Sequence, residues 1–311
     1  MAVKGPLFYS KILLFGEYGI IKDSKGLSIP YNFYNGALKT ADLSDAISKK
    51  SNDSLKGLAD YLQNTPSELV NFDLKRLKGD LANGMYFDSS IPQGYGVGSS
   101  GALVASIYDK YAENKITVLE NLTREKLLKL KAVFSYVESF FHGSSSGLDP
   151  LNSYLSLPIL INSKNNIETA GIPSQKKQNK GAVFLLDSGI IGETAPMVNL
   201  FMEKMKQDGF RSMLKHQFTK HTDACIEDFL SGNVSSLFTN IKQLSKTVLD
   251  NFKPMIPEKF HNLWKKGIDT NDYYLKLCGS GGGGYILGFA ADFEKAKKSL
   301  KDYQLEVVYH F

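Results

Sequence analysis

Two glycine clusters, one in each half of the chain, are the sequence feature that most constrains the fold. The first lies within residues 92–101 (PQGYGVGSSG), and the second within residues 278–284 (CGSGGGG). Glycine adopts backbone conformations that other residues avoid, and it lets a ligand or another loop approach the main chain closely. A length of 311 residues predicts two domains, with one large domain as the alternative, and one glycine cluster lies in each half of the chain.

The first cluster stands at the start of a predicted helix, because apolar residues recur at steps of three and four from Ala102 to Ala112. A helix N-terminus offers unpaired N–H groups and a partial positive charge. Together with a glycine loop it forms an anion site, usually for phosphate. Ser99 and Ser100 add hydroxyls that can bind phosphate oxygens or a magnesium ion. The alternative is a plain turn with an N-cap serine.

Other nucleotide-binding patterns are weak or absent. Gly96, Gly98 and Gly101 match G-x-G-x-x-G, but a dinucleotide site needs a strand directly before it and an acidic residue about 20 positions later. Pro92 precedes the cluster instead, so an NAD-binding oxidoreductase is only an alternative. The P-loop pattern G-x-x-x-x-G-K-[ST] and the protein-kinase motifs are both missing.

Two carboxylates flank a loop of small residues. The periodicity over Arg124–Phe141 predicts a helix, with Glu138 near its end and Asp149 beyond the loop. Phosphoryl transfer needs one carboxylate to hold Mg²⁺ and a second to orient or deprotonate the attacking hydroxyl. Ordinary surface acids are the alternative. His142, before a glycine, is interpreted as a favourable cation at the helix end, with a role as a base as the alternative.

Lys11 lies inside an apolar strand, where its ammonium either reaches the surface or faces the site and stabilises negative charge. The second glycine cluster joins two predicted strands, and four consecutive glycines exceed what a hairpin requires. We interpret this cluster as a loop that approaches a ligand or the first cluster closely.

Three blocks in this order resemble the GHMP kinases, the superfamily of galacto-, homoserine, mevalonate and phosphomevalonate kinases. They are Ser10–Glu17 (SKILLFGE), Pro92–Gly101 and Leu277–Gly284. The middle block is similar to the P-x-x-x-G-[LV]-G-S-S-[AG] signature, and the resemblance spans nearly the whole chain. Within the superfamily, the first block and the segment Glu138–Asp149 are most similar to the mevalonate kinase family.

The resemblance implies an α/β (α+β) fold of two domains. The N-terminal domain, residues 1–175, would resemble the ribosomal protein S5 domain 2 type and bind ATP. The C-terminal domain, residues 176–311, would be ferredoxin-like. The polar stretch 162–181 is the candidate boundary, and ATP and acceptor would meet in the cleft between the domains.

The resemblance also implies roles for individual residues. Asp149 would be the catalytic carboxylate, and Lys11 would assist at the attacking hydroxyl. Ser100 and Glu138 would hold Mg²⁺. Substrate contacts would come from Glu17, Tyr18 and Ser146. The implied ATP-binding residues are Pro92, Gly94, Gly96, Gly98, Ser99, Ser100, Gly101, Gly281 and Gly282.

The acceptor stays open at this point, because Tyr18 stands where mevalonate kinases usually have histidine. Mevalonate or a similar hydroxy acid is the first expectation. Phosphomevalonate, homoserine and sugars are alternatives, as is a GHMP-fold protein that binds ligand without catalysis. Diphosphomevalonate decarboxylases share the fold but lack counterparts of Lys11 and Glu138.

Composition excludes several classes of protein. The net charge of +5 is mild, and the basic cluster Lys176, Lys177 and Lys180 indicates a solvated loop, so no nucleic-acid partner is expected. Cys225 and Cys278 are too few for a disulfide scaffold or a cysteine zinc site. We expect a cytoplasmic protein without a signal peptide or membrane span, and by analogy a possible homodimer.

Sequence patterns also predict individual elements. The expected helices cover 44–62, 102–112, 124–141, 196–207, 212–230, 234–250 and 292–300. The expected strands cover 8–15 with a resumption at Ile20 and Ile21, then 69–74, 182–186, 273–277, 285–289 and 305–309.

Overall fold

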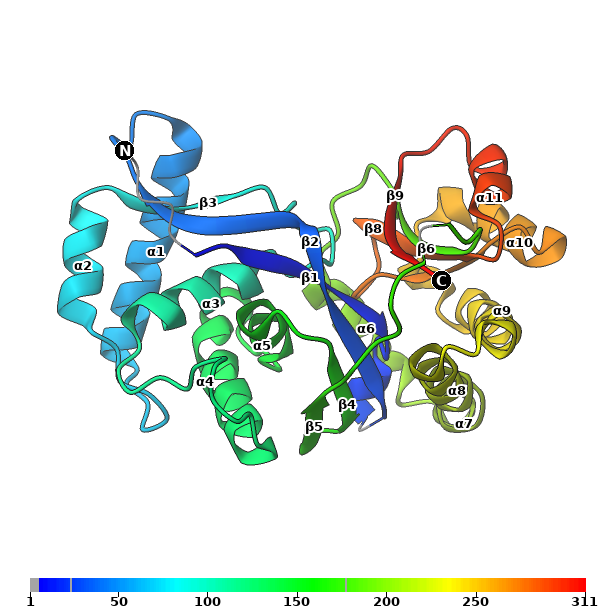
Figure 1. The fold of residues 1–311 in the computed structure, drawn as a ribbon, viewed down its shortest axis with the longest axis horizontal. Helices are drawn as coiled ribbons and strands as arrows, with labels where there is room; N and C mark the ends of the chain where they lie inside the picture. The colour runs from blue at the N-terminus through cyan, green and yellow to red at the C-terminus, as the bar shows by residue number, and fades with distance from the viewer. Residues whose placement is uncertain (1–5, 23, 177) are drawn as a thin grey trace. The chain divides into compact units, whose positions relative to one another are not determined.

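The computed structural model describes residues 6–22, 24–176 and 178–311, and this part of the chain forms two compact units (Figure 1). Unit 1 comprises the described residues up to Lys11, then Ile29–Pro92 and Gly98–Leu157, and unit 2 comprises Ile12–Ser28, Gln93–Val97 and Pro158–Phe311. The domain boundary near residue 175 stays a prediction. Lys177, part of the basic cluster interpreted as a solvated loop, lies outside the described residues. So do the first five residues, on which the expectation of no signal peptide partly depends.

The first sheet contains strands from both halves of the sequence. Its strand order is β1-β2-β4-β5, and β3 pairs with β2. The pairings of β2 with β3 and β4, and of β4 with β5, are antiparallel. The bounds are β1 Phe8–Phe15, β2 Gly26–Thr40, β3 Met85–Ser89, β4 Ile159–Ser163 and β5 Asn166–Thr169.

Unit 1 contains two groups of packed helices. In one, α1 packs on α2 and on β3; in the other, α3, α4 and α5 pack on one another (Figure 1). The bounds are α1 Ala46–Asn64, α2 Leu74–Ala82, α3 Ser99–Tyr111, α4 Arg124–His142 and α5 Leu148–Leu155.

Helix α4 shows how the sequence defines the element that carries Glu138. Thr123 caps its N-terminus by accepting a hydrogen bond from the Lys126 N–H. Its buried residues repeat at steps of three and four and include Leu127, Leu130, Phe134 and Val137. The helix ends at Gly143, whose φ of 70° suits glycine. The predicted helix is therefore confirmed.

Unit 2 contains an antiparallel sheet in the order β7-β8-β6-β9. With helices between β6 and β7 and between β8 and β9, this is the βαββαβ arrangement of a ferredoxin-like fold, as predicted. The strands are β6 Ala182–Asp187, β7 Tyr274–Leu277, β8 Tyr285–Ala290 and β9 Leu305–His310. The helices are α6 Thr194–Lys204, α7 Asp208–Met213, α8 Thr219–Ser231, α9 Val234–Asn251, α10 His261–Thr270 and α11 Phe293–Ser299. Short 3-10 helices cover Gly19–Lys22, Lys253–Met255 and Glu258–Phe260, and a π-helical turn covers Leu214–Phe218.

Two predicted strand segments are wrong. Residues 69–74 form no strand, because Asp73 caps α2 by accepting from the Arg76 N–H, and only a single bridge joins Phe72 to Ala112. The expected resumption of the first strand at Ile20 and Ile21 is instead part of a 3-10 helix. Tyr18 has a φ of 61° just before it, which ends the extended conformation.

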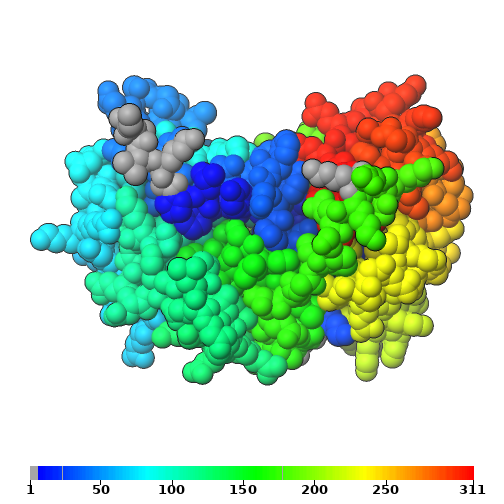
Figure 2. Space-filling view, in the orientation of Figure 1, coloured from blue at the N-terminus to red at the C-terminus, as the bar shows by residue number. Residues whose placement is uncertain are grey.

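Helix α9 of unit 2 has a buried apolar side and an outer side with polar residues. On α9, the buried side includes Leu237, Ile241, Leu244 and Val248, while Lys246 is exposed. Figure 2 shows surface in yellow, the colour of this part of the chain. Within the described ranges, no helix combines the length and the apolar character needed to span a bilayer.

Candidate active site

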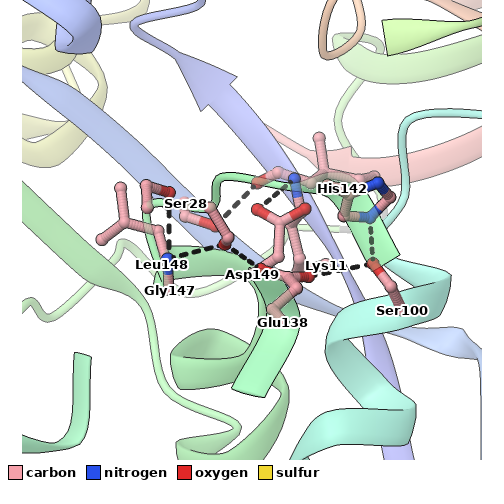
Figure 3. Close-up of polar contacts among 11 residues, drawn as sticks. Lys11, Ser28, Ser100, Glu138, His142, Gly147, Leu148 and Asp149 are labelled. Atoms are coloured by element: carbon pink, nitrogen blue, oxygen red, sulfur yellow. Dashed lines mark hydrogen bonds and ion pairs between the residues drawn. The ribbon is translucent and has the colours of Figure 1, made fainter. Parts of the chain in front are cut away.

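An ion pair between Lys11 and Asp149 lies at the centre of the candidate site in unit 1. Lys11 Nζ is 2.9 Å from Asp149 Oδ1, and the two side chains point toward one another in Figure 3. The Lys11 side chain is 5% exposed, whereas that of Asp149 is 39% exposed. A buried cation thus lies beside a carboxylate that remains accessible to a ligand.

Glu138 lies beside this pair and is held by two serine hydroxyls. Ser100 Oγ donates to Glu138 Oε1 at 2.9 Å, and Ser145 Oγ donates to Glu138 Oε2. Ser145 Oγ also accepts from the Gly147 N–H at 3.0 Å, which fastens the loop between α4 and α5. Both carboxylate oxygens of Glu138 therefore have fixed positions.

The environment of Glu138 disfavours its ionised form. Burial raises its pKa from 4.5 to about 7, and the nearby Asp149 charge acts in the same direction. The two serine hydrogen bonds and Lys11 lower the pKa, but by less than burial and the Asp149 charge together raise it. A strongly perturbed carboxyl next to an accessible ion pair is typical of a functional site.

Three glycines allow the close packing of this site. A Cβ on Gly98 would lie 3.0 Å from the Lys11 side chain, and a Cβ on Gly101 would lie 2.7 Å from the Asp149 backbone. Gly147 has a φ of 71°, and a Cβ there would lie 2.1 Å from Lys131 O on α4. These contacts bring the first turns of α3 and α5 together, so Ser100 and Asp149 approach Glu138.

The described residues of unit 1 fit a hard divalent cation. Ser100 and Glu138 supply a hydroxyl and a carboxylate oxygen at the N-terminus of α3, and Mg²⁺ prefers oxygen ligands. Across residues 6–22, 24–176 and 178–311, no group of three or more His, Cys, Asp or Glu side chains is arranged for a metal.

In unit 2, the first glycine cluster packs directly on the second. A Cβ on Gly96 would lie 2.6 Å from Cys278 O, and one on Gly284 would lie 2.5 Å from Tyr95 Cα. Gly192, whose N–H donates to Gly94 O at 3.0 Å, brings a third glycine segment to the same place. The expectation that the second cluster approaches the first is confirmed, and loop packing is one reason for these glycines.

The remaining predicted residues are distributed as follows. Pro92 ends a segment of unit 1, Ser99 is the first residue of α3, and Ser146 is exposed with its Oγ 3.4 Å from the Leu148 N–H. Gly281 and Gly282 belong to the second cluster in unit 2, where the Gly282 N–H donates to Met255 O at 2.7 Å. Their roles in ATP or substrate binding stay predictions.

Glu17 and Tyr18, predicted to contact substrate, are buried in unit 2. The Glu17 carboxylate pairs with Lys276, and the Tyr18 hydroxyl donates to Ser280 O. Burial raises the pKa of Tyr18 above its ordinary value, so the phenol is neutral. These contacts show what both side chains bind within their own unit, and the predicted substrate role remains untested.

Sequence reasoning missed three contributors. His142 Nε2 lies 3.0 Å from Ser100 Oγ, although the sequence indicated only a helix-end cation. Ser145 was one of three consecutive serines, with nothing to distinguish the one that reaches Glu138. The segment around Gly192 matches no sequence motif, and its position shortly after β6 is the one signal that could have indicated a loop near the site.

Comparison with solved structures identifies the fold. The chain is similar to L. major mevalonate kinase in complex with R-mevalonate, with a TM-score of 0.64 and 18% identity over 97% of this chain and 93% of that one. It is similar to S. pneumoniae phosphomevalonate kinase in complex with phosphomevalonate and AMPPNP, with a TM-score of 0.62 and 13% identity over 98% of each chain. It is also similar to Lactococcus lactis galactokinase complexed with galactose, with a TM-score of 0.64 and 12% identity over 98% of this chain and 92% of that one. A scan of protein-family models and a search of curated sequences find no match.

The chain therefore has the α/β fold of small-molecule kinases. More particularly, this is the GHMP kinase fold, as the sequence resemblance implied. At these identities the likeness concerns the fold, and the three neighbours are in complex with different small molecules.

Proposed function

We propose that this protein transfers the γ-phosphoryl group of MgATP to a hydroxyl group of a small molecule. The observation that carries the proposal is the Lys11–Asp149 pair, 2.9 Å apart, beside Glu138 and Ser100. A structural ion pair would not need an accessible carboxylate next to a buried lysine. A transferase needs both, because the carboxylate must meet the acceptor hydroxyl.

The chain's own residues divide the work. Asp149 orients the acceptor hydroxyl and receives its proton as the oxygen attacks phosphorus. Lys11 stabilises the negative charge that grows on the same oxygen. Since Gly98 packs on the Lys11 stem, the ammonium has little freedom to leave this position.

Ser100 and Glu138 are the residues that would hold Mg²⁺, and Ser145 keeps the Glu138 carboxylate aimed. A bound magnesium ion supplies positive charge that neutralises the phosphate oxygens. The first turn of α3, which starts at Ser99, offers its N–H groups to the same phosphates.

Mevalonate is the acceptor we favour. The support is the sequence pattern of the Glu138–Asp149 segment and the likeness of the fold to mevalonate kinases from two organisms. Phosphomevalonate is the second candidate because phosphomevalonate kinase is among the fold neighbours, and galactose is a third for the same reason. A cytoplasmic protein, with a homodimer as the assembly to test, completes the proposal.

An ATP-consumption screen over mevalonate, phosphomevalonate, homoserine and galactose tests it. We expect turnover with one acceptor, and a decrease of about 10² to 10⁴-fold in kcat for Asp149→Asn, the usual contribution of a positioned acid or base. The matched control is Asp88→Asn, because Asp88 is a surface acid of unit 1 paired with Lys39. Nucleotide binding without turnover on any acceptor would favour a ligand-binding protein instead.

A further inference from the structure

A buried ion pair in unit 2 joins the turn after β1 to the strand that enters the second glycine loop, Cys278–Gly284. The Lys276 ammonium contacts the Glu17 carboxylate, and their side chains are only 2% and 5% exposed. Lys276 Nζ also donates to Leu277 O at 3.0 Å. Burying two charges is costly, and an apolar pair of similar volume is often at least as stable. We therefore explain the presence of the Glu17–Lys276 pair by the geometry that it fixes and not by a contribution to the stability of the fold.

Tyr18, the residue after Glu17, makes a second connection to the second glycine loop. The Tyr18 hydroxyl donates to Ser280 O, and its ring stacks on Phe201 with the ring centroids 4.7 Å apart. Tyr18 has a φ of 61°, a left-handed conformation that is costly for a residue with a Cβ. A strained backbone that aims one hydroxyl at one carbonyl indicates a positioning role.

The loop needs such connections because of its composition. All its glycines have positive φ, with Gly281, Gly282 and Gly284 at 73°, 77° and 68°. Glycine loses more conformational freedom on folding than any other residue, so a glycine loop is ordered only where other groups hold it. Lys276 and Tyr18 hold its entry and its middle, and the Gly282 N–H adds a bond to Met255 O at 2.7 Å.

We propose that Glu17, Tyr18 and Lys276 are positioning residues that keep the second glycine loop in its nucleotide-binding conformation. This rests on the proposed function and on the expectation from the sequence resemblance that Gly281 and Gly282 of this loop contact ATP. Because the Tyr18 hydroxyl is bonded to Ser280 O of the loop, we expect Tyr18 to affect the binding of the nucleotide and not the binding of the acceptor.

The first experiment compares Tyr18→Phe with Tyr273→Phe by hydrogen–deuterium exchange. Tyr273 is the matched control, since its buried hydroxyl also donates to a backbone carbonyl, that of Leu263, at 2.9 Å. We expect faster exchange in residues 278–284 for Tyr18→Phe only. Unchanged exchange in that loop would overturn the proposal without reference to any nucleotide.

The second experiment measures AMPPNP affinity by calorimetry and the KM values by ATP consumption. Tyr18→Phe should weaken AMPPNP binding and raise the KM for ATP by about three- to tenfold, the equivalent of one hydrogen bond, and leave the KM for the acceptor unchanged. The double variant Glu17→Gln/Lys276→Met should act in the same direction without leaving a buried charge unpaired. Lys25→Met, which removes the exposed pair with Glu227, should have no effect.

The two proposals fail in different ways. If the wild-type protein binds no nucleotide, the proposed function is wrong, and the exchange result still decides whether Tyr18 orders the loop. If the wild type binds AMPPNP and Tyr18→Phe binds it equally well, or if only the KM for the acceptor changes, the positioning role is wrong and the proposed function stands.

Discussion

The buried carboxyl of Glu138 should make the stability of this protein depend on pH in a predictable direction. Its pKa is about 7 in the folded protein, against 4.5 as the ordinary value. Between these two values the folded state binds more protons than the unfolded state, so the free energy of unfolding falls as pH rises. The stability associated with protonated Glu138 is complete below about pH 4.5 and is lost as pH rises through 7.

The size of the effect follows from the same two values. At 1.36 kcal/mol for each pKa unit, the difference corresponds to a loss on the order of 3 kcal/mol. Glu138→Gln removes the titrating group and nearly preserves its shape. Because a serine hydroxyl can accept as well as donate, Ser100 or Ser145 can still pair with the glutamine amide. The variant should match the wild type near pH 5 and exceed it near pH 8.

Urea unfolding in EDTA at both pH values measures this difference. Glu203→Gln is the control, since it changes an exposed glutamate in unit 2 and should keep the wild-type dependence on pH. Adding Mg²⁺ near pH 8 should stabilise the wild type more than Glu138→Gln, because the glutamine amide lacks the negative charge that favours binding of the ion. If Glu138→Gln shows the same loss of stability with pH as the wild type, burial does not destabilise this carboxylate and the reasoning is refuted.

Three further predictions concern catalysis, packing and capping. Lys11→Met should lower kcat in the ATP-consumption assay with little effect on nucleotide affinity, because the charge acts on the acceptor oxygen; an unchanged kcat would contradict this. Gly101→Ala should destabilise the protein by more than about 1 kcal/mol, since the new Cβ would lie 2.7 Å from the Asp149 backbone, whereas Gly79→Ala, with nothing within 4 Å, should stabilise α2 by about 0.5–1 kcal/mol in thermal unfolding. Asp45→Ala should lower the midpoint of thermal unfolding, because the Asp45 side chain caps α1 by accepting from the Ile47 and Ser48 N–H groups; an unchanged midpoint would contradict the capping role.

The sequence predicted elements well where one pattern dominated. The periodicity over Arg124–Phe141 matches α4, and the helix expected over 292–300 corresponds to α11, which Asp292 caps. Strand β2 was missed because its central residues, Pro30 to Gly36, include proline, asparagines and glycine, which individually disfavour a strand. Its pairing with neighbouring strands outweighs those preferences.

The candidate site was predictable in composition but not in detail. Lys11, Ser100, Glu138 and Asp149 came from motif resemblance, and the structure brings them together within unit 1. The contact of His142 with Ser100 depends on how the chain reverses between α4 and α5, which no local pattern encodes.

The way the chain alternates between the two units has a consequence for how the protein can be produced and folded. Unit 2 takes Ile12–Ser28 and Gln93–Val97 from the N-terminal half, although its ferredoxin-like sheet lies beyond residue 181. A fragment that stops near residue 175 would carry these segments without that sheet, and the complementary fragment would lack them. The N-terminal fragment would therefore contain all of unit 1 but could not complete unit 2, and the C-terminal fragment could not complete unit 2 either. Unit 2 can complete its sheet only after β9 has been synthesised. Truncation at the sequence midpoint should therefore yield aggregation-prone fragments instead of separate domains.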